Sequence, residues 1–202
     1  MKRYYFIVRF VPENADHELL SGRCLYVLHG FMSRHETRII GVTFPEWSSG
    51  GTGRVIGFVS HNQNLLVEFA QHPYFQSMSD EGFLDILGVD FVPDGLPEIR
   101  FLRNQKIAKI FPGDKRRRLE RLRRRAESRG DGFNPSKMSY IDVCEYNRIL
   151  MDSRSSGNRF YLHVQRQGCA NDICCRYNSY GLANQEHAKG TVPDLSGLFP
   201  LF

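Results

Sequence analysis

The sequence predicts an α+β protein in two parts, and three observations support this. Within the first 98 residues, apolar periods of two and of about 3.6 alternate in the order strand, helix, strand, strand, helix, strand. That order is typical of an antiparallel sheet with both helices on one face, so we expect residues 1–98 to form a ferredoxin-like domain. After this point the chain becomes strongly basic and then rich in loops. We therefore expect residues 99–202 to form a C-terminal α/β domain with an arginine-rich helix at 114–129.

Each N-terminal element follows from its local pattern. Alternating or β-branched apolar runs predict strands at 4–11, 39–44, 54–60 and 86–92. A helix is expected over 15–35, where five apolar residues recur at helical spacing, namely Leu20, Cys24, Val27, Leu28 and Phe31. A second helix is expected over 62–78, ended or kinked at His72-Pro73. Residues 98–103 extend or follow the last strand.

The C-terminal elements are less regular. The basic helix is expected to begin at Asp114 as its N-cap and to end at Gly130. Residues 140–152 fit either a helix or a strand, and 159–165 alternate like a strand. A further strand is a candidate at 176–182, and the apolar ending at 197–202 is expected to pack against the body.

The basic run is the most biased part of the chain. Eight of the eleven residues from 115 to 125 are Lys or Arg. Residues 103–129 carry a net charge of +9 against +5 for the whole chain, so the other residues sum to about −4. Such a local concentration of cations indicates a polyanionic ligand. Nucleic acid is the favoured ligand, while an acidic protein partner and a localisation tail are the alternatives.

Helical geometry organises the basic run further. Five arginines share about a third of the helix circumference, namely Arg117, Arg118, Arg121, Arg124 and Arg125. A narrow apolar seam of Leu119, Leu122 and Ala126 lies beside them. We expect this seam to dock the helix onto the body, so that the arginine stripe faces the ligand.

Composition limits the remaining function classes. No stretch approaches the roughly 20 apolar residues of a membrane span, so we expect a soluble, cytoplasmic protein. Five cysteines, an odd number, do not suggest a disulfide framework; a zinc site of Cys169, Cys174, Cys175 and His163 is an alternative to free thiols. The scattered acids disfavour a two-metal nuclease, and we expect neither a metal nor another cofactor. Any RNA cleavage would then use the substrate's own 2′-hydroxyl and a histidine base.

His29 differs from the other histidines in its position on the predicted first helix. It projects about 180° away from the apolar stripe, on the face not needed by the first sheet. Gly22 and Gly30 leave room nearby for close approach. Spacing alone leaves an ordinary exposed histidine as the simpler interpretation.

Several stretches together resemble a known family. The resemblance covers essentially the whole chain in the right order and rests on the arginine-rich helix, the aromatic C-terminus and four motifs: CLYVLHGF (24–31), RIIGVTFP (38–45), SRSSGNRFYLHV (153–164) and SYGL (179–182). These are similar to the type I-F CRISPR repeat-processing endoribonuclease, the Cascade subunit that cleaves precursor CRISPR RNA at the base of each repeat hairpin. The sequences of the N-terminal motifs are most similar to those of members encoded with Tn7-like transposons.

The resemblance implies a mechanism and its residues. It implies metal-independent cleavage to a 2′,3′-cyclic phosphate, after which the enzyme keeps the 3′ hairpin of the CRISPR RNA. His29 corresponds to the histidine of the catalytic pair, the base toward the 2′-hydroxyl, and Ser153 to the serine that holds the ribose. Ser155 and Tyr180 match supporting positions of the active site.

The resemblance also implies RNA contacts. Phe160 matches an aromatic that stacks on the terminal base pair of the hairpin, and Arg103 and Gln105 match residues that read bases at the foot of the stem. The arginine helix departs from the family pattern, because Leu122 stands where a further arginine is expected. A shifted register would use Arg121, Arg124 and Arg125 instead.

The partners follow from the same resemblance. They are precursor CRISPR RNA, the neighbouring Cascade backbone subunit and, if the transposon link holds, a transposon-encoded targeting subunit. Two other interpretations stay open: an RNA-binding assembly subunit that grips the hairpin without cutting it, and a nonspecific basic RNA-binding protein of the same fold. The sequence does not identify the repeat, the turnover rate, or a role in defence or transposition.

Overall fold

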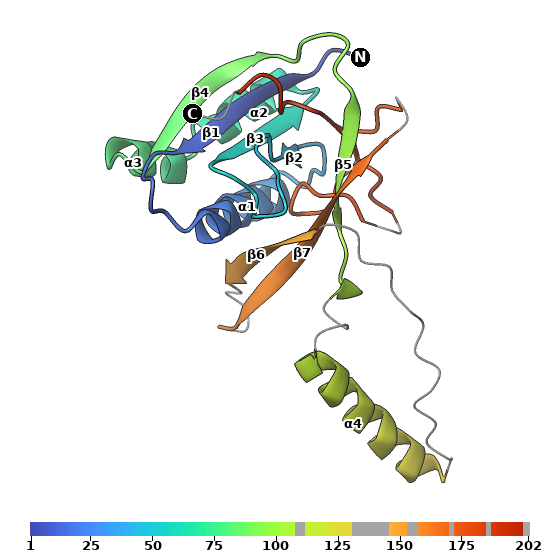
Figure 1. The fold of residues 1–202 in the computed structure, drawn as a ribbon. Coiled ribbons are helices and arrows are strands. Elements are labelled where there is room, and N and C mark those ends of the chain that lie inside the picture. Colours follow the sequence, from blue (N-terminus) through green and yellow to red (C-terminus); the bar gives the residue numbers. More distant parts are fainter. Residues whose placement is uncertain (108–111, 131–145, 153–156, 170–171, 185–186, 200–202) are drawn as a thin grey trace.

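A computed structural model gives the fold (Figure 1). It describes the chain except for residues 108–111, 131–145, 153–156, 170–171, 185–186 and 200–202. The described residues form four helices and two antiparallel sheets of four strands each. The α+β class expected from the sequence is therefore confirmed.

The first sheet contains the N-terminal strands. Their order is β2-β3-β1-β4, with every neighbouring pair antiparallel; the strands are β1 (Tyr4–Phe10), β2 (Gly41–Thr43), β3 (Val55–Ser60) and β4 (Leu84–Phe91). Helix α1 (His17–Arg34) connects β1 to β2. The second predicted helix is divided into α2 (Gln63–Ala70) and α3 (Pro73–Asp80). The division falls at His72, whose Nδ1 accepts the Tyr74 N–H and caps α3, as the His72-Pro73 step predicts.

An aromatic cluster joins the helices to the first sheet. Phe6 of β1 stacks on Phe58 of β3 at 5.0 Å between ring centroids. Phe69 of α2 reaches both Phe75 of α3, at 5.2 Å, and Phe31 of α1, at 4.9 Å. All five rings are buried. This packing fixes one face of α1 against the sheet, because interdigitated aromatic rings leave little freedom to slide.

The second sheet is built from the C-terminal half of the chain. Its order is β6-β7-β5-β8, again antiparallel; the strands are β5 (Glu98–Arg103), β6 (Tyr146–Asp152), β7 (Arg159–Gly168) and β8 (Val192–Pro193). Residues 98–103 thus follow β4 without extending it. The division of the chain into domains at residue 98 stays a prediction.

The prediction of a candidate strand at 176–182 is wrong. Those residues form a loop with a turn at Ser179-Tyr180, because Gly181 adopts φ +72° and the Asn178 side chain accepts two backbone N–H groups within the loop. In the apolar ending at 197–202, Phe199 packs as expected: it is partly buried against Ile7, Val55 and Leu195, and its ring lies 6.4 Å from that of Tyr5. Residues 200–202 lie outside the described residues.

Helix α4 (Pro112–Arg129) is the arginine-rich helix. It begins two residues before Asp114, so the prediction of Asp114 as N-cap is wrong, and it ends at Gly130, which has φ +72° as expected. The helix stands apart from both sheets in Figure 1. Leu122 is 42% exposed, so the predicted docking of the apolar seam onto the body is also not seen. So narrow a seam offers too little apolar area to hold a helix surrounded by hydrated cations.

Candidate active site

Helix α1 carries His29 and lies between the two sheets. Asp16 caps its first turn by accepting the Leu19 N–H at 2.9 Å. The face opposite the aromatic cluster meets β6, and Gly22 makes that approach possible: a Cβ there would lie 1.9 Å from the carbonyl oxygen of Leu150. The expectation that Gly22 gives room for close approach is confirmed. Gly30 has nothing within 4 Å of such a Cβ and faces open space.

His29 stacks on Tyr180. The ring centroids are 4.8 Å apart and the ring planes differ by 17°. Tyr180 is held by its loop, because the Asn178 side chain accepts the backbone N–H groups of Tyr180 at 2.8 Å and of Leu182 at 3.2 Å. A side chain at Gly181 would meet the core at 2.6 to 2.7 Å, so the loop lies close against it. Two residues that are 151 positions apart thus form one rigid stack.

Arg103 completes this arrangement from the end of β5. The central carbon of its guanidinium lies 5.5 Å from the centroid of the Tyr180 ring, within the range of a cation–π contact. Its backbone N–H donates to the Ala183 carbonyl at 2.9 Å, which ties β5 to the loop of Tyr180. Partial burial lowers the pKa of the Arg103 guanidinium, whereas the coulombic effect of Tyr180 raises it. The group stays a cation near neutral pH because its ordinary pKa is above about 12.

Two polar atoms of this cluster are buried without a hydrogen-bond partner among the described residues: Nδ1 of His29 and Nε of Arg103. Buried polar atoms are paired in most proteins, so an unpaired atom on each of two side chains that contact Tyr180 suggests a functional site. Phosphate chemistry needs one group that holds the anion and another that takes a proton. Arg103 and His29 are groups of these two types, and each contacts the Tyr180 ring. We call His29, Tyr180 and Arg103 the stacked cluster.

The two predicted serines, Ser153 and Ser155, lie outside the described residues. Asp152, the last described residue before them, forms an ion pair with Arg23 of α1 at 3.1 Å. Strand β6 therefore ends beside the helix that carries His29.

The predicted RNA contacts on β7 and β5 are partly exposed. Phe160 is half-buried and packs against the core, on the strand face it shares with Leu162. Gln105 is exposed just after β5. Sequence reasoning missed Tyr161, which is 47% exposed and has the Arg148 guanidinium 5.2 Å from its ring centroid. The alternation of β7 predicts its exposure, because successive residues of a strand face opposite sides and Phe160 faces the core.

The predicted arginine stripe of α4 is exposed where its side chains are described, at Arg121, Arg124 and Arg125. The side chains of Arg117 and Arg118 lie outside the description. Glutamates partly neutralise the helix through pairs four residues apart: Arg123 with Glu127 at 2.8 Å and Arg124 with Glu120 at 3.7 Å. Such exposed pairs are weak and readily exchanged for phosphate contacts.

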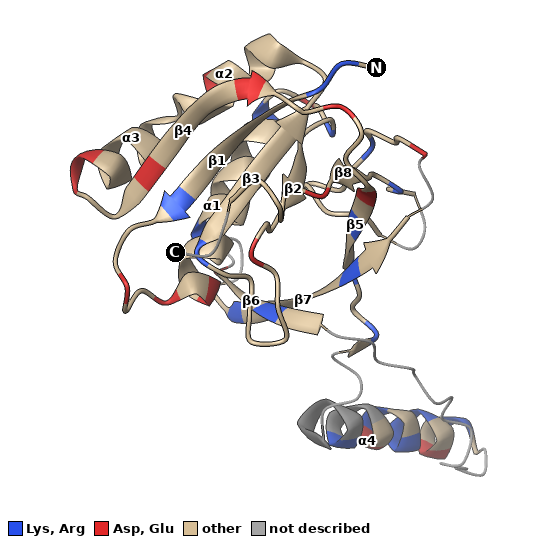
Figure 2. Cartoon of the chain, turned by 45° about the horizontal axis from the view of Figure 1, so that its top comes forward, with Lys and Arg blue, Asp and Glu red and all other residues tan. Residues whose placement is uncertain are grey.

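Charge is segregated along the chain. Residues 55–99 contain seven acids and no Lys or Arg, whereas residues 103–129 contain twelve Lys or Arg. Figure 2 shows the result, with red on α2, α3 and β4 and blue concentrated on α4. An anionic ligand is therefore directed to α4 and away from the far side of the first sheet.

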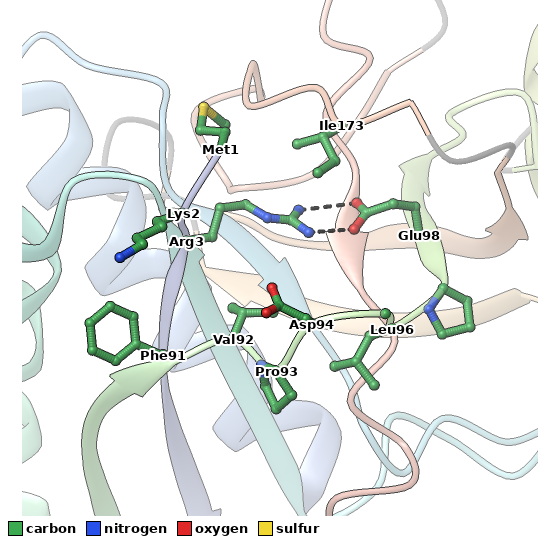
Figure 3. Close-up of a pocket in the computed structure, with 12 residues that line it drawn as sticks. Met1, Lys2, Arg3, Phe91, Val92, Pro93, Asp94, Leu96, Glu98 and Ile173 are labelled. Carbon is green, nitrogen blue, oxygen red and sulfur yellow. Dashed lines mark hydrogen bonds and ion pairs between the residues drawn. The ribbon is translucent and has the colours of Figure 1, made fainter.

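A cavity of about 820 Å³ lies elsewhere, where the N-terminus meets the β4–β5 connection (Figure 3). Its wall includes a buried ion pair between Arg3 and Glu98, with Phe91 and Ile173 nearby. No histidine and no predicted site residue lines it. Histidine side chains therefore do not contribute to this cavity.

Neither a metal site nor a membrane span was found in the described part of the chain. No three or more His, Cys, Asp or Glu side chains converge there in a way that could hold a metal ion, so Cys169, Cys174, Cys175 and His163 do not form the alternative zinc site. None of the described helices combines the length and the apolar character that crossing a membrane requires.

Comparison with known proteins assigns the family. A search of individually curated proteins gave no match to this chain. A family model described as CRISPR-associated protein (Cas_Csy4) matches residues 5–195, nearly the full length. The match agrees with the resemblance to CRISPR repeat-processing endoribonucleases that the motifs carry. The chain belongs to the Cas_Csy4 family of CRISPR-associated proteins.

Proposed function

We propose that this protein is a metal-independent endoribonuclease that cleaves precursor CRISPR RNA at the base of the repeat hairpin and then keeps the 3′ hairpin. Family membership supports the substrate class. The observation that carries the proposal is the stacked cluster, in which His29 lies on Tyr180 at 4.8 Å and Arg103 lies 5.5 Å from the same ring. A potential base and a cation are thereby held against one tyrosine ring, which supports acid–base cleavage of RNA.

The proposed reaction needs only one base and a positioned phosphate. His29 takes the proton of the 2′-hydroxyl, whose oxygen attacks the adjacent phosphorus. The bond from phosphorus to the 5′ oxygen breaks, and that oxygen takes a proton from solvent. The products are a 2′,3′-cyclic phosphate and a free 5′-hydroxyl. Ser153 holds the ribose in the attacking geometry, while Ser155 and Tyr180 support the base.

Other parts of the chain bind the hairpin. The exposed arginines of α4 bind phosphates along the stem, and Arg117 and Arg118 belong to the same stripe. Phe160 stacks on the terminal base pair, and Arg103 and Gln105 read bases at the stem foot. We further propose that the protein acts in the cytoplasm within a type I-F Cascade, beside the backbone subunit. A Tn7-like system would add a transposon-encoded targeting subunit.

The test is cleavage of a repeat hairpin by the purified protein in EDTA. We expect a 2′,3′-cyclic phosphate at the new 3′ end, and loss of cleavage with retained binding in His29→Ala. His61→Ala is the matched control, because His61 is an exposed histidine after β3 and should not affect the rate. Intact RNA that is bound tightly would instead support a non-cleaving assembly subunit. Equal affinity for a scrambled hairpin would point to nonspecific RNA binding.

A further inference from the structure

Between Arg103 and Gln105 lies a side chain that points into the protein. Asn104 is only 7% exposed, and its Nδ2 donates to Oε1 of Gln165 on β7 at 2.7 Å. Gln165 is itself 4% exposed. Two buried amides thus meet directly behind the residues proposed to read the stem foot.

The same asparagine closes the turn that follows β5. Its Oδ1 accepts the backbone N–H of Lys106 at 3.0 Å, and its backbone carbonyl accepts the N–H of Ile107 at 3.3 Å. Its own N–H donates to the carbonyl of His163 at 2.9 Å. Ile107 is 1% exposed and secures the far end of the turn. Every polar group of Asn104 is therefore used to shape residues 104–107, and Gln105 is left exposed at the tip.

We propose that the buried Asn104–Gln165 pair is a positioning device that determines specificity: it fixes the turn from which Gln105 meets a base at the stem foot, without touching RNA itself. The inference rests on the proposed function, because it assumes that Arg103 and Gln105 read those bases. Apolar packing alone would hold β5 in place but would leave the turn at 104–107 free to adopt more than one conformation. A fully paired buried amide network does choose one, because any other arrangement leaves a polar group unpaired.

The pair also links the two proposed recognition elements. Gln165 is on β7, the strand that begins with Arg159 and carries Phe160. Strand β7 pairs with β5 such that Leu102 is opposite Gln165. Phe160 and the turn at 104–107 are therefore both held by the paired strands β5 and β7. A base pair stacked on Phe160 then lies at a fixed distance from Gln105.

The test compares two hairpins, the cognate repeat and one whose base pair at the stem foot is inverted. The readout is the ratio of kcat/KM for the two RNAs. In Gln165→Leu we expect this ratio to fall about tenfold. Without the buried pair, the turn that carries Gln105 is not fixed before binding, and ordering it reduces the affinity for the cognate base pair. The kcat for the cognate RNA should stay within about twofold of the wild type, since the stacked cluster is untouched. Circular dichroism and thermal melting select an assay temperature at which the variant is folded.

A matched series at Asn104 separates positioning from general destabilisation. Asn104→Leu removes both the amide contact and the acceptor for Lys106, so discrimination should fall at least as far. Asn104→Asp keeps the acceptor, and the Gln165 amide can rotate to donate its N–H to the carboxylate. This variant should recover discrimination, even if its melting temperature stays low.

The outcomes distinguish the inference from the proposal beneath it. If Gln105→Ala loses discrimination but Gln165→Leu and Asn104→Leu keep it, the positioning role is overturned while base reading stands. If Gln105→Ala and Arg103→Ala both discriminate like the wild type, base reading at this turn is wrong and the inference falls with it. Equal losses in Asn104→Asp and Asn104→Leu would also refute the positioning role.

Discussion

Gly22→Ala should destabilise the protein although alanine is the better helix former. The new Cβ would lie 1.9 Å from the Leu150 carbonyl oxygen and 3.0 Å from its carbon, so α1 and β6 must separate by more than 1 Å. Both obstacles are backbone atoms of a strand that is hydrogen-bonded to β7, and they cannot rotate away. Overpacking of this kind costs about 1–3 kcal/mol, and the rigid obstacle places it at the upper end. After about 1 kcal/mol gained from helix propensity, the net loss should be about 2 kcal/mol.

Gly30→Ala is the matched control on the same helix. Nothing lies within 4 Å of a Cβ at Gly30, so only the helix propensity changes. This variant should be more stable than the wild type by about 0.5–1 kcal/mol. Urea unfolding followed by circular dichroism measures both free energies of unfolding. If Gly22→Ala unfolds at the same urea concentration as Gly30→Ala, the close approach of α1 and β6 is wrong.

Three other properties can be checked directly. If five arginines of α4 each neutralise one phosphate, the logarithm of hairpin affinity should fall with the logarithm of salt concentration with a slope of roughly −4; a slope near zero would remove α4 from the interface. Phe160→Ala should weaken hairpin binding by about 1–3 kcal/mol if the ring stacks on the terminal base pair, whereas unchanged affinity in the folded variant would contradict the stacking. Burial raises the pKa of both the Tyr177 hydroxyl and the Cys24 thiol. The folded state then holds these protons longer than the unfolded state does, so the free energy of unfolding should decrease as pH rises above about 8.5. Tyr177→Phe should reduce this decrease in urea titrations, and an identical pH profile would refute the assignment.

Local sequence patterns were sufficient for the first half of the fold. The apolar periods located β1, α1 and β3 to within a few residues, and His72-Pro73 marked the break between α2 and α3. The C-terminal half was harder because its sheet joins distant segments. Strand β5 finds its partner β7 some sixty residues later, and no local pattern states which sheet it enters. The loop at 176–182 alternates like a strand, yet Asn178 and Gly181 turn it.

The candidate site shows the same limit. Helical spacing placed His29 away from the apolar stripe of α1, but its stacking partner Tyr180 came only from family resemblance. The Asn104–Gln165 contact could not be predicted, because a buried amide pair looks like two surface residues in a sequence. Residues that act through tertiary contacts leave no periodic signal. Residues proposed to act through a whole helix face, like the arginines of α4, leave a periodic pattern that can be found in the sequence.

We infer from the segregation of charge that α4 and the stacked cluster have different tasks in RNA binding. The seven acids of residues 55–99 repel RNA, while the net charge of +9 on residues 103–129 attracts it, so α4 should make the first contact. At physiological salt this field is screened beyond about 8 Å, so it brings the hairpin to the helix but does not set its register. Register requires contacts at van der Waals and hydrogen-bond distance, and the described residues suited to it, Arg103, Tyr180 and His29, are fixed by the body of the protein. Raising the salt concentration should therefore reduce affinity much more than it changes the position of the cut. If higher salt instead shifted the cleavage site, α4 would be setting the register and this division of tasks would be wrong.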